Sequence, residues 1–308
     1  MQTKSEGVNV VCVASWNVDL VAFIPEPLRR GETQLAHAFE RLPGGKGSNA
    51  SIAAARMGAS VGLIARVGGD DFGQMGLDLW RREGIQSEHV VRSGNEANGT
   101  ALILVFADGD NSIAVYPGAG AGLTSSHVDA ARSLIAGARI VMSSCEVPIP
   151  ATHRAFDLAR QFGVQTLLNP APAIDIPDDL WPLIDVLTPN ENELLQLAKV
   201  QDVQEAAEVL LARGVGAVVV TLGERGCALY RANLPALKVP GHVLTIKDTI
   251  GAGDTFTGAL AAQLAMASEW PEALRMANAA AALSTQAHGA VSAMPSLATV
   301  AGFLKRSH

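Results

Sequence analysis

Short runs of apolar, mostly β-branched residues recur along the chain, and they predict strands that are buried on both faces. The runs lie at residues 8–13, 61–64, 139–142, 165–168, 185–187 and 217–220. Segments with helical spacing lie between them, at residues 46–58, 152–162, 191–199 and 203–213. Strands that alternate with helices are typical of βαβ units. We therefore expect an α/β fold with a mainly parallel sheet and helices on both of its faces.

Two stretches, residues 19–42 and 99–116, interrupt this rhythm because neither has a clear helical period. The second contains two strand-like runs, 100–106 and 111–116, around an Asp-Gly turn, which predicts a β-hairpin. The two stretches are able to pair as a small sheet outside the main one, hinged as a lid. Ordinary edge strands are the alternative. We expect a single domain over residues 1–308, with lid segments at approximately 17–43 and 97–118.

The composition supports a folded protein and excludes some partners. Hydrophobic residues make up 48% of the 308 residues and charged residues 17%, so a substantial core is expected. The net charge of −7 argues against a basic face that grips nucleic acid. Residues 1–7 are polar and give no signal-peptide core, and no apolar run reaches the length of a membrane span. The three cysteines are widely spaced: Cys12, Cys145 and Cys227. We expect free thiols in a soluble, cytoplasmic protein without a membrane partner.

The usual nucleotide-binding motifs are missing. No GxxxxGK[ST] or GxGxxG pattern occurs: in the Gly-Gly-Lys-Gly-Ser at residues 44–48 the lysine is followed by glycine, and no glycine stands five positions before the glycine that precedes it. The HExxH, GxSxG and protein-kinase motifs are also missing. If the protein binds a nucleotide, we expect it to use a different binding motif.

Residues 248–258, Asp-Thr-Ile-Gly-Ala-Gly-Asp-Thr-Phe-Thr-Gly, are the clearest candidate for chemistry. An apolar stripe at i, i+4 and i+8 predicts that a buried helix begins here: Phe256, Leu260 and Leu264. Its first turn would hold small residues whose N–H groups lack helical partners, forming an anion hole: Gly251, Ala252 and Gly253. Asp254 follows directly, and a carboxylate beside a phosphate site is suited to taking a proton from the attacking hydroxyl. A helix cap in a glycine-rich loop is the alternative.

Other polar groups follow predicted strands. Asn17 and Asp19 come after the first strand and Glu146 after a later one, where open α/β sheets bind ligands. Lys46 and Asn49, in a loop that opens a helix, offer donors to hydroxyl groups. Each of these is alternatively a solvated loop residue or part of a plain turn.

Two further loops also follow apolar strands. Asn190 and Glu193 are spaced to face one way on a first helical turn, where they are able to organise a hydrated Mg²⁺ and phosphate oxygens. Residues 221–226 form a loop permissive enough to lie against a nucleotide. Taken alone, both are equally explained as capping and turn residues.

Together and in this order, these motifs resemble the ribokinase family, also called the PfkB carbohydrate kinases, from residue 8 to about 295. Its two signatures are matched at residues 44–49 and, with high specificity, at residues 248–258. Further ribokinase-like phrases are Asn-Pro-Ala-Pro-Ala at 169–173, Thr-Pro-Asn-Glu at 188–191 and Thr-Leu-Gly at 221–223. The resemblance implies a doubly wound sheet with a β lid, pairing of lids in a homodimer, and Mg-ATP-dependent phosphorylation of a sugar, with D-ribose 5-phosphate as the leading product.

The resemblance also implies a role for each matched residue. Asp254 would be the general base, beside an anion hole at Gly251, Ala252 and Gly253. The sugar would be held by Asn17, Asp19, Gly45, Lys46, Gly47, Asn49 and Glu146. The ATP site would be lined by Asn190, Thr221, Leu222, Gly223, Glu224, Arg225, Gly226, Gly253 and Asn278, with Glu193 acting indirectly on Mg²⁺. An activating K⁺ would be bound by carbonyls of Asp248, Ile250, Ser284, Ala287 and Gly289.

Three residues depart from the family pattern. Ala293 stands where relatives often have a serine that helps to bind the monovalent cation, which bears on K⁺ dependence. Pro43 and Trp16 are also unexpected, and we expect them to reshape the sugar pocket. The alternatives are a kinase of the same family for fructose, another pentose or hexose, or a nucleoside; a sugar-binding homologue without turnover; and an unrelated α/β enzyme whose glycine loops are structural.

Overall fold

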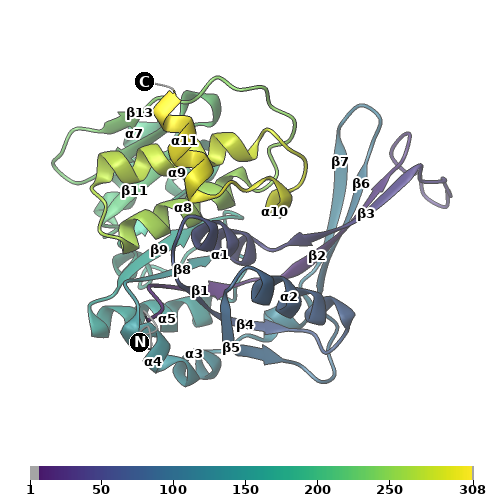
Figure 1. Ribbon diagram of the computed structural model, residues 1–308, viewed down its shortest axis with the longest axis horizontal. Helices are drawn as coiled ribbons and strands as arrows, with labels where there is room; N and C mark the ends of the chain where they lie inside the picture. The colour runs from purple at the N-terminus through teal and green to yellow at the C-terminus, as the bar shows by residue number, and fades with distance from the viewer. Residues whose placement is uncertain (1–6, 307–308) are drawn as a thin grey trace.

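The computed structural model describes residues 7–306 and contains two sheets of unequal size (Figure 1). The larger has nine strands. In order across the sheet they are β13 (Leu237–Val239), β12 (Cys227–Tyr230), β11 (Ala217–Thr221), β10 (Val186–Leu187), β9 (Gln165–Asn169), β8 (Ile140–Ser144), β1 (Val10–Ala14), β4 (Val61–Val67) and β5 (Gln86–Arg92). The pairings of β11 with β12 and of β12 with β13 are antiparallel, and all other pairings in this sheet are parallel. The predicted mainly parallel sheet is confirmed.

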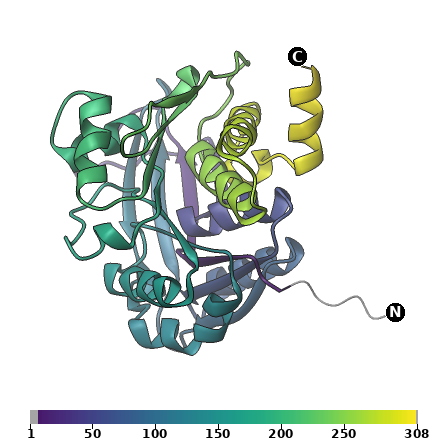
Figure 2. The ribbon, with the colours of Figure 1, turned by 90° about the vertical axis from the view of Figure 1, so that its left-hand side faces the viewer.

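Helices cover both faces of this sheet, as Figure 2 shows. One face packs against α1 (Lys46–Arg56), α2 (Asp71–Arg82), α8 (Ala252–Ala265), α9 (Trp270–Ser284), α10 (Ala290–Ala293) and α11 (Leu297–Arg306). The other packs against α3 (Ser125–Ala130), α4 (Arg132–Gly137), α5 (Ile149–Phe162), α6 (Glu191–Ala198) and α7 (Val203–Ala212). Strand β1 serves both cores, because alternate side chains point to opposite faces: Cys12 packs in the first core and Val13 in the second.

The smaller sheet, called the small sheet below, projects from the body (Figure 1). Its strands are β3 (Ala38–Gly44), β2 (Asn17–Phe23), β6 (Gly99–Val105) and β7 (Asn111–Tyr116), in that order. Strands β6 and β7 form the predicted hairpin, and β2 joins them by pairing in parallel with β6. The two stretches that interrupt the βα rhythm therefore do form one sheet.

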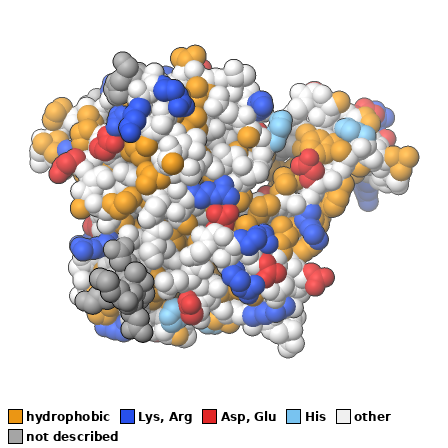
Figure 3. All heavy atoms as spheres, in the orientation of Figure 1, with side chains coloured by type: hydrophobic (Ala, Val, Ile, Leu, Met, Phe, Trp, Pro, Cys, Tyr) orange, Lys and Arg blue, Asp and Glu red, His pale blue; other side chains and the backbone are white. Residues whose placement is uncertain are grey.

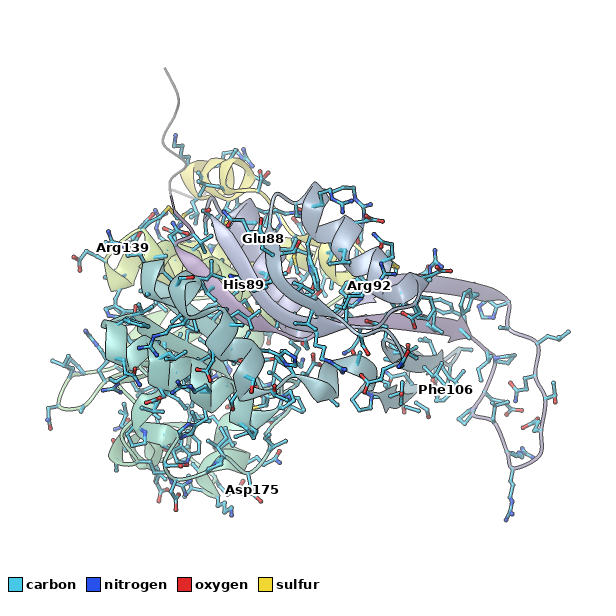
Figure 4. All side chains as sticks on the ribbon, turned by 90° about the horizontal axis from the view of Figure 1, so that it is seen from below. Glu88, His89, Arg92, Phe106, Arg139 and Asp175 are labelled. Atoms are coloured by element: carbon cyan, nitrogen blue, oxygen red, sulfur yellow. The ribbon has the colours of Figure 1, made fainter. Side chains whose placement is uncertain are left out.

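Strand β5 escaped prediction because its sequence is polar. Figure 4 shows Glu88, His89 and Arg92 along this strand, which pairs only with β4 at the edge of the large sheet. Antiparallel β12 and β13, at the opposite edge, were also missed. The edge strands β5 and β13 have one solvated side, so they lack the continuous apolar run that marks the central ones, whereas β12 is apolar and buried but only four residues long.

Helices α1 and α8 cross with their backbones almost in contact. A Cβ atom on Gly258 of α8 would lie 2.1 Å from the carbonyl oxygen of Ala50 in α1. No other residue type fits there without moving the helices apart. The beginnings of the two helices, which carry the candidate residues, are thereby held together.

Three short 3₁₀ turns complete the structure: η1 (Gly118–Gly122), η2 (Trp181–Leu183) and η3 (Gly223–Arg225). Within residues 7–306, none of the helices is both long and apolar enough to cross a membrane. The expectation that the chain has no signal-peptide core was based on residues 1–7, and residues 1–6 lie outside the described part of the chain.

Candidate active site

The candidate residues gather at one edge of the large sheet. Strands β1, β8, β9, β10 and β11 are parallel, so their carboxyl ends meet at that edge. Successive strand ends lead into Asn17, Glu146, Asn169, Asn190 and Thr221. A pocket of about 190 Å³ opens there. It is lined by Lys46, Asn169, Ala171, Thr188, Asn190, Glu193, Thr221, Thr249, Gly251, Gly253 and Asp254.

The first turn of α8 faces this pocket. Gly251 precedes the helix with φ of 73°, and a Cβ there would lie 2.6 Å from the side chain of Ala290. A Cβ on Gly253 would meet nothing within 4 Å, so this backbone is open to a ligand. The N–H of Ala252 donates to the carbonyl oxygen of Thr249 at 3.2 Å. The amides left for an anion are therefore those of Gly253 and Asp254, because first-turn amides have no intrahelical acceptor.

Asp254 is buried in the pocket wall, with 6% of its surface exposed. Asn49 donates a hydrogen bond from Nδ2 to Oδ2 of Asp254 at 2.8 Å. Burial raises the pKa of Asp254 to about 6; Lys46 and the Asn49 hydrogen bond oppose this rise, while Glu146 and Glu193 add to it. The carboxyl group is therefore poised to exchange a proton near neutral pH.

Lys46 is the cation of the site. Burial disfavours its charge, but the carboxylates of Asp254, Glu146, Glu193 and Asp19 outweigh this effect and raise the pKa of Lys46. The ammonium group therefore remains charged under the influence of four acidic groups, and no other Lys or Arg is among the described residues that line the pocket. A further polyanion needs more positive charge than Lys46 supplies.

The predicted sugar-side residues lie together where β1 leads into β2. Glu146 accepts hydrogen bonds at Oε2 from the hydroxyl of Ser15 at 2.7 Å and from the backbone N–H of Lys46 at 2.8 Å. A Cβ on Gly44 would lie 2.4 Å from Oδ1 of Asp19. Burial raises the pKa of Asp19 to about 6, with Glu146 and Asp254 adding to the rise and Lys46 opposing it.

The same contacts place the rest of the sugar-side set. Gly45, with φ of 92°, caps α1, and Gly47 donates its N–H to the hydroxyl of Ser15 at 3.1 Å. A Cβ on Gly99 would lie 2.2 Å from Oδ1 of Asn17. Gly44 and Gly99 therefore allow the polar side chains of β2 to lie close against the backbones of the neighbouring strands β3 and β6.

The predicted nucleotide-side residues extend along the same edge. Asn190 and Glu193 cap α6 reciprocally, each side chain bonding the backbone N–H of the other. Asn190 also forms an isolated bridge with Thr221.

Other members of that set surround residues 239–241. A Cβ on Gly226 would lie 2.1 Å from the carbonyl oxygen of Val239, and Asn278 donates to the carbonyl oxygen of Pro240 at 2.8 Å. Arg225 forms an ion pair with Glu191. Leu222 closes the turn by donating its N–H to the carbonyl oxygen of Gly226 at 2.8 Å. Of the predicted ATP set, only Asn190, Thr221 and Gly253 line the pocket itself.

The metal candidates differ in what the structure offers. Residues 7–306 contain no cluster of three or more His, Cys, Asp or Glu able to hold a metal ion. Glu193, the predicted indirect contact of Mg²⁺, lines the pocket together with Asn190.

The five predicted K⁺ ligands lie on two adjacent segments. Asp248 accepts the N–H of Ile250 at Oδ1 and that of Gly289 at Oδ2, at 2.9 and 2.8 Å. The N–H groups of Lys247 and Asp248 both donate to the carbonyl oxygen of Thr285. Ser284 and Ala287 flank that contact in sequence. These contacts hold the segment before α8 against the segment that follows α9.

Several pocket residues received no role from the sequence. Asn169 donates from Nδ2 to the hydroxyl of Thr257 at 3.1 Å, and Thr188 lies 3.2 Å from the same hydroxyl. This network ties α8 to the ends of β9 and β10. Asn169, Ala171 and Thr188 lie in the ribokinase-like stretches at residues 169–173 and 188–191, and this resemblance was the sequence feature that could have identified them as pocket residues.

Trp16 does not line the pocket. Its side chain is 2% exposed, and its indole N–H donates to the carbonyl oxygen of Phe72 in α2. The expectation that Trp16 reshapes the sugar pocket stays a prediction, and Trp16 would act on that pocket through its neighbour Asn17.

The comparisons with known proteins agree on one family. The profile of "pfkB family carbohydrate kinase" matches residues 8–297. A bifunctional ribokinase/ribose-5-phosphate isomerase A from Fructilactobacillus sanfranciscensis is 36% identical over 93% of this chain, which spans 54% of that protein. A ribokinase from Staphylococcus aureus is 36% identical over 94% of this chain and 98% of its own length. The structure of Arabidopsis thaliana ribokinase complexed with ribose and ATP matches with a TM-score of 0.90 at 29% identity, over 97% of this chain and 99% of that one.

Proposed function

The chain belongs to the pfkB family of carbohydrate kinases, and on that premise we propose that it transfers the terminal phosphoryl group of ATP to the 5-hydroxyl of D-ribose. The Staphylococcus aureus ribokinase is 36% identical to this chain, and the Arabidopsis ribokinase structure is complexed with ribose and ATP. One observation carries the proposal most directly: buried Asp254, bonded to Asn49, adjoins the open first turn of α8.

In the proposed mechanism, Asp254 accepts the proton of the sugar hydroxyl as that oxygen attacks the terminal phosphorus of ATP; the bond from this phosphorus to the bridging oxygen breaks, and ADP leaves. The raised pKa of Asp254, about 6, suits a base that is ionised at neutral pH and still able to hold a proton. The amides of Gly253 and Asp254, with the positive end of the α8 dipole, stabilise charge on the transferred group. Asn49, Asp19 and Glu146 orient the sugar.

The charge balance of the site supports Mg²⁺ as a partner of ATP. Four carboxylates influence Lys46, so a bare triphosphate would be repelled. Mg²⁺ supplies positive charge on the phosphates, and the pair Asn190 and Glu193 would contact its water shell. K⁺ would bind to the carbonyls around Asp248 and Gly289 and support the adjacent start of α8. Ala293 removes one expected hydroxyl ligand from that site.

We further propose that residues 1–308 form one kinase domain in which the small sheet acts as the lid. Asn17 and Asp19 lie on β2, so a movement of this sheet would carry sugar contacts with it. The small sheet also exposes large apolar side chains: Phe39, Leu102, Ile113, Val115 and Tyr116. Figure 3 shows hydrophobic atoms gathered on this projection. Because directly paired residues share a face, Ile113 and Val115 lie on one face of the sheet and Phe39, Leu102 and Tyr116 on the other. Exposed apolar side chains of this kind favour a homodimer that pairs the lids.

A substrate panel tests the proposal. ADP release is measured with Mg-ATP and, separately, D-ribose, 2-deoxy-D-ribose, D-fructose and adenosine, each with and without K⁺. We expect the highest kcat/KM with D-ribose, and NMR of the product should place the phosphate on the 5-oxygen. A higher kcat/KM with fructose or adenosine would show that D-ribose is not the preferred acceptor, while the proposed phosphoryl transfer from ATP would stand. Binding of a sugar with no ADP release in the presence of any of the four acceptors would contradict a kinase function.

A further inference from the structure

Two buried tryptophans connect the two segments that carry the sugar-side residues. Trp16 immediately precedes Asn17 at the start of β2, and Trp80 lies near the end of α2. Their side chains are 2% and 0% exposed, and their rings meet edge to face with centroids 5.6 Å apart. This is a favourable aromatic geometry, and neither ring contributes to the pocket lining.

Each indole N–H has a defined acceptor. Trp16 donates to the carbonyl oxygen of Phe72 at 2.9 Å, at the beginning of α2. Trp80 donates to the hydroxyl of Ser48 at 2.8 Å. Ser48 is completely buried in the first turn of α1, directly before Asn49. Helix α2 is therefore bonded to the segment of Asn17 at one end and to the segment of Asn49 at the other.

The surrounding backbone leaves little room for these segments to shift. A Cβ on Gly76 of α2 would lie 2.7 Å from the ring of Trp16. A Cβ on Gly47 would lie 2.6 Å from Cα of Ala14, and the N–H of Ser48 donates to the carbonyl oxygen of Ser15 at 3.1 Å. Close packing of this kind transmits a change at one side chain to its neighbours.

We propose that Trp16 and Trp80 are positioning residues for the sugar: they fix the start of β2 relative to the start of α1, and so fix Asn17 and Asp19 relative to Asn49. The inference deepens the proposed function and rests on it. It assigns the tryptophans no contact with substrate. Their effect appears in sugar affinity, while the nucleotide-side residues on α6 and η3 are held by other contacts.

A double-mutant cycle tests the inference. Trp80→Phe keeps the aromatic ring and removes the N–H, whereas Ser48→Ala removes the acceptor of the same bond. We expect each variant to raise the KM for D-ribose roughly 5- to 10-fold, the value of one buried hydrogen bond, and to change the KM for ATP less than about twofold. Trp80→Phe/Ser48→Ala should be no worse than either single variant, because only one bond is lost.

Trp181→Phe is the matched control. Trp181 is 1% exposed in the other core, and its indole N–H has no acceptor within residues 7–306, so the same substitution breaks no hydrogen bond. Both KM values should stay at the wild-type level in this control. If Trp80→Phe does not fold, Ser48→Ala alone tests the same bond with the loss of a single oxygen.

The outcomes separate the inference from the function on which it rests. Wild-type turnover with an unchanged ribose KM in Trp80→Phe and Ser48→Ala would overturn the positioning role. Equal rises in the KM for ribose and ATP would also overturn it, because a general loosening of the fold has that effect. Absence of turnover in both the wild-type protein and Trp181→Phe would instead overturn the proposed function.

Discussion

Asn49 donates a hydrogen bond of 2.8 Å to the carboxylate of Asp254 across 205 residues of sequence. The bond joins the first turn of α1 to the first turn of α8, so it brings a proposed sugar ligand and the proposed base to the same point. It also favours the ionised form of Asp254, in opposition to burial. Substitutions of Asp254 or Asn49 should therefore alter turnover or its pH dependence without unfolding the protein.

Asp254→Asn should lower kcat with D-ribose about 10²- to 10⁴-fold, the usual contribution of a general base. The amide keeps an acceptor for Asn49, so the KM for ribose should change little. The variant should also melt at or above the wild-type temperature at pH 7.5, because a buried carboxylate with a raised pKa costs stability above that pKa. Steady-state assays and calorimetry provide the measurements.

Asp202→Asn is the control for this substitution, since Asp202 caps α7 and has no place in the pocket. It should retain wild-type kcat. Turnover by Asp254→Asn at close to the wild-type rate would remove Asp254 from the role of base.

The pH profile should report the ionisation of Asp254. The value of kcat/KM for ribose should rise with pH through about 6, as Asp254 loses its proton, and level off above it. Asn49→Leu removes the donor that stabilises the carboxylate, so it should move this midpoint upward by about one unit.

Asp19 has a pKa of about 6 as well, and Asp19→Asn separates the two groups. This variant keeps Asp254, so the limb near pH 6 should remain even if the KM for ribose rises. A profile that becomes flat in Asp19→Asn would assign the ionisation to Asp19.

Two glycines of the α8 loop should respond differently to the same change. Gly251→Ala forces a residue with a Cβ into φ of 73° against Ala290, and should lower the free energy of unfolding by about 1–3 kcal/mol. Gly253→Ala meets open space, so urea denaturation should give the wild-type midpoint. Its methyl group should instead obstruct the phosphate position and lower kcat/KM for ATP at least about tenfold. Equal stability losses in both variants would contradict this account.

The exposed face of the small sheet that carries Ile113 and Val115 predicts the oligomeric state. Val115→Lys places a charge on a side chain that is 62% exposed on β7, and it should convert the proposed dimer to a monomer in sedimentation velocity runs. Val243→Lys, at a fully exposed position in the body, should leave the dimer intact. A wild-type monomer at micromolar concentration would refute lid pairing.

The sequence predicted the parts of the fold in which local pattern and burial agree. The central strands carry apolar residues on both faces, as Val10–Ala14 does, and this pattern is readable without a structure. The edge strand Gln86–Arg92 carries polar residues, and its pairing with β4 depends on a partner about 25 residues earlier in the chain. Tertiary context therefore decides it.

The same division applies to the candidate site. Asn190 and Thr221 follow buried strands, so their placement at one edge was predictable from parallel topology. The bond between Asn169 and Thr257 and the burial of Trp16 depend on how α8 and α2 pack on the sheet. Sequence spacing contains no information on such side-chain directions. Occupation of the Ala252 amide by Thr249 likewise required the loop geometry.

The crossing of α1 and α8 at Gly258 has a consequence for how this protein is able to vary. The Ala50 carbonyl meets Gly258 directly and the small side chain of Ala53 lies beside it, so the crossing has no room for a larger side chain at residue 258. Mutation at this crossing is therefore unable to adjust the distance between Asp254 on α8 and Asn49 on α1 in small steps. New acceptor preferences have to arise on β2 and the rest of the small sheet, the one wall of the site that is attached to a different sheet.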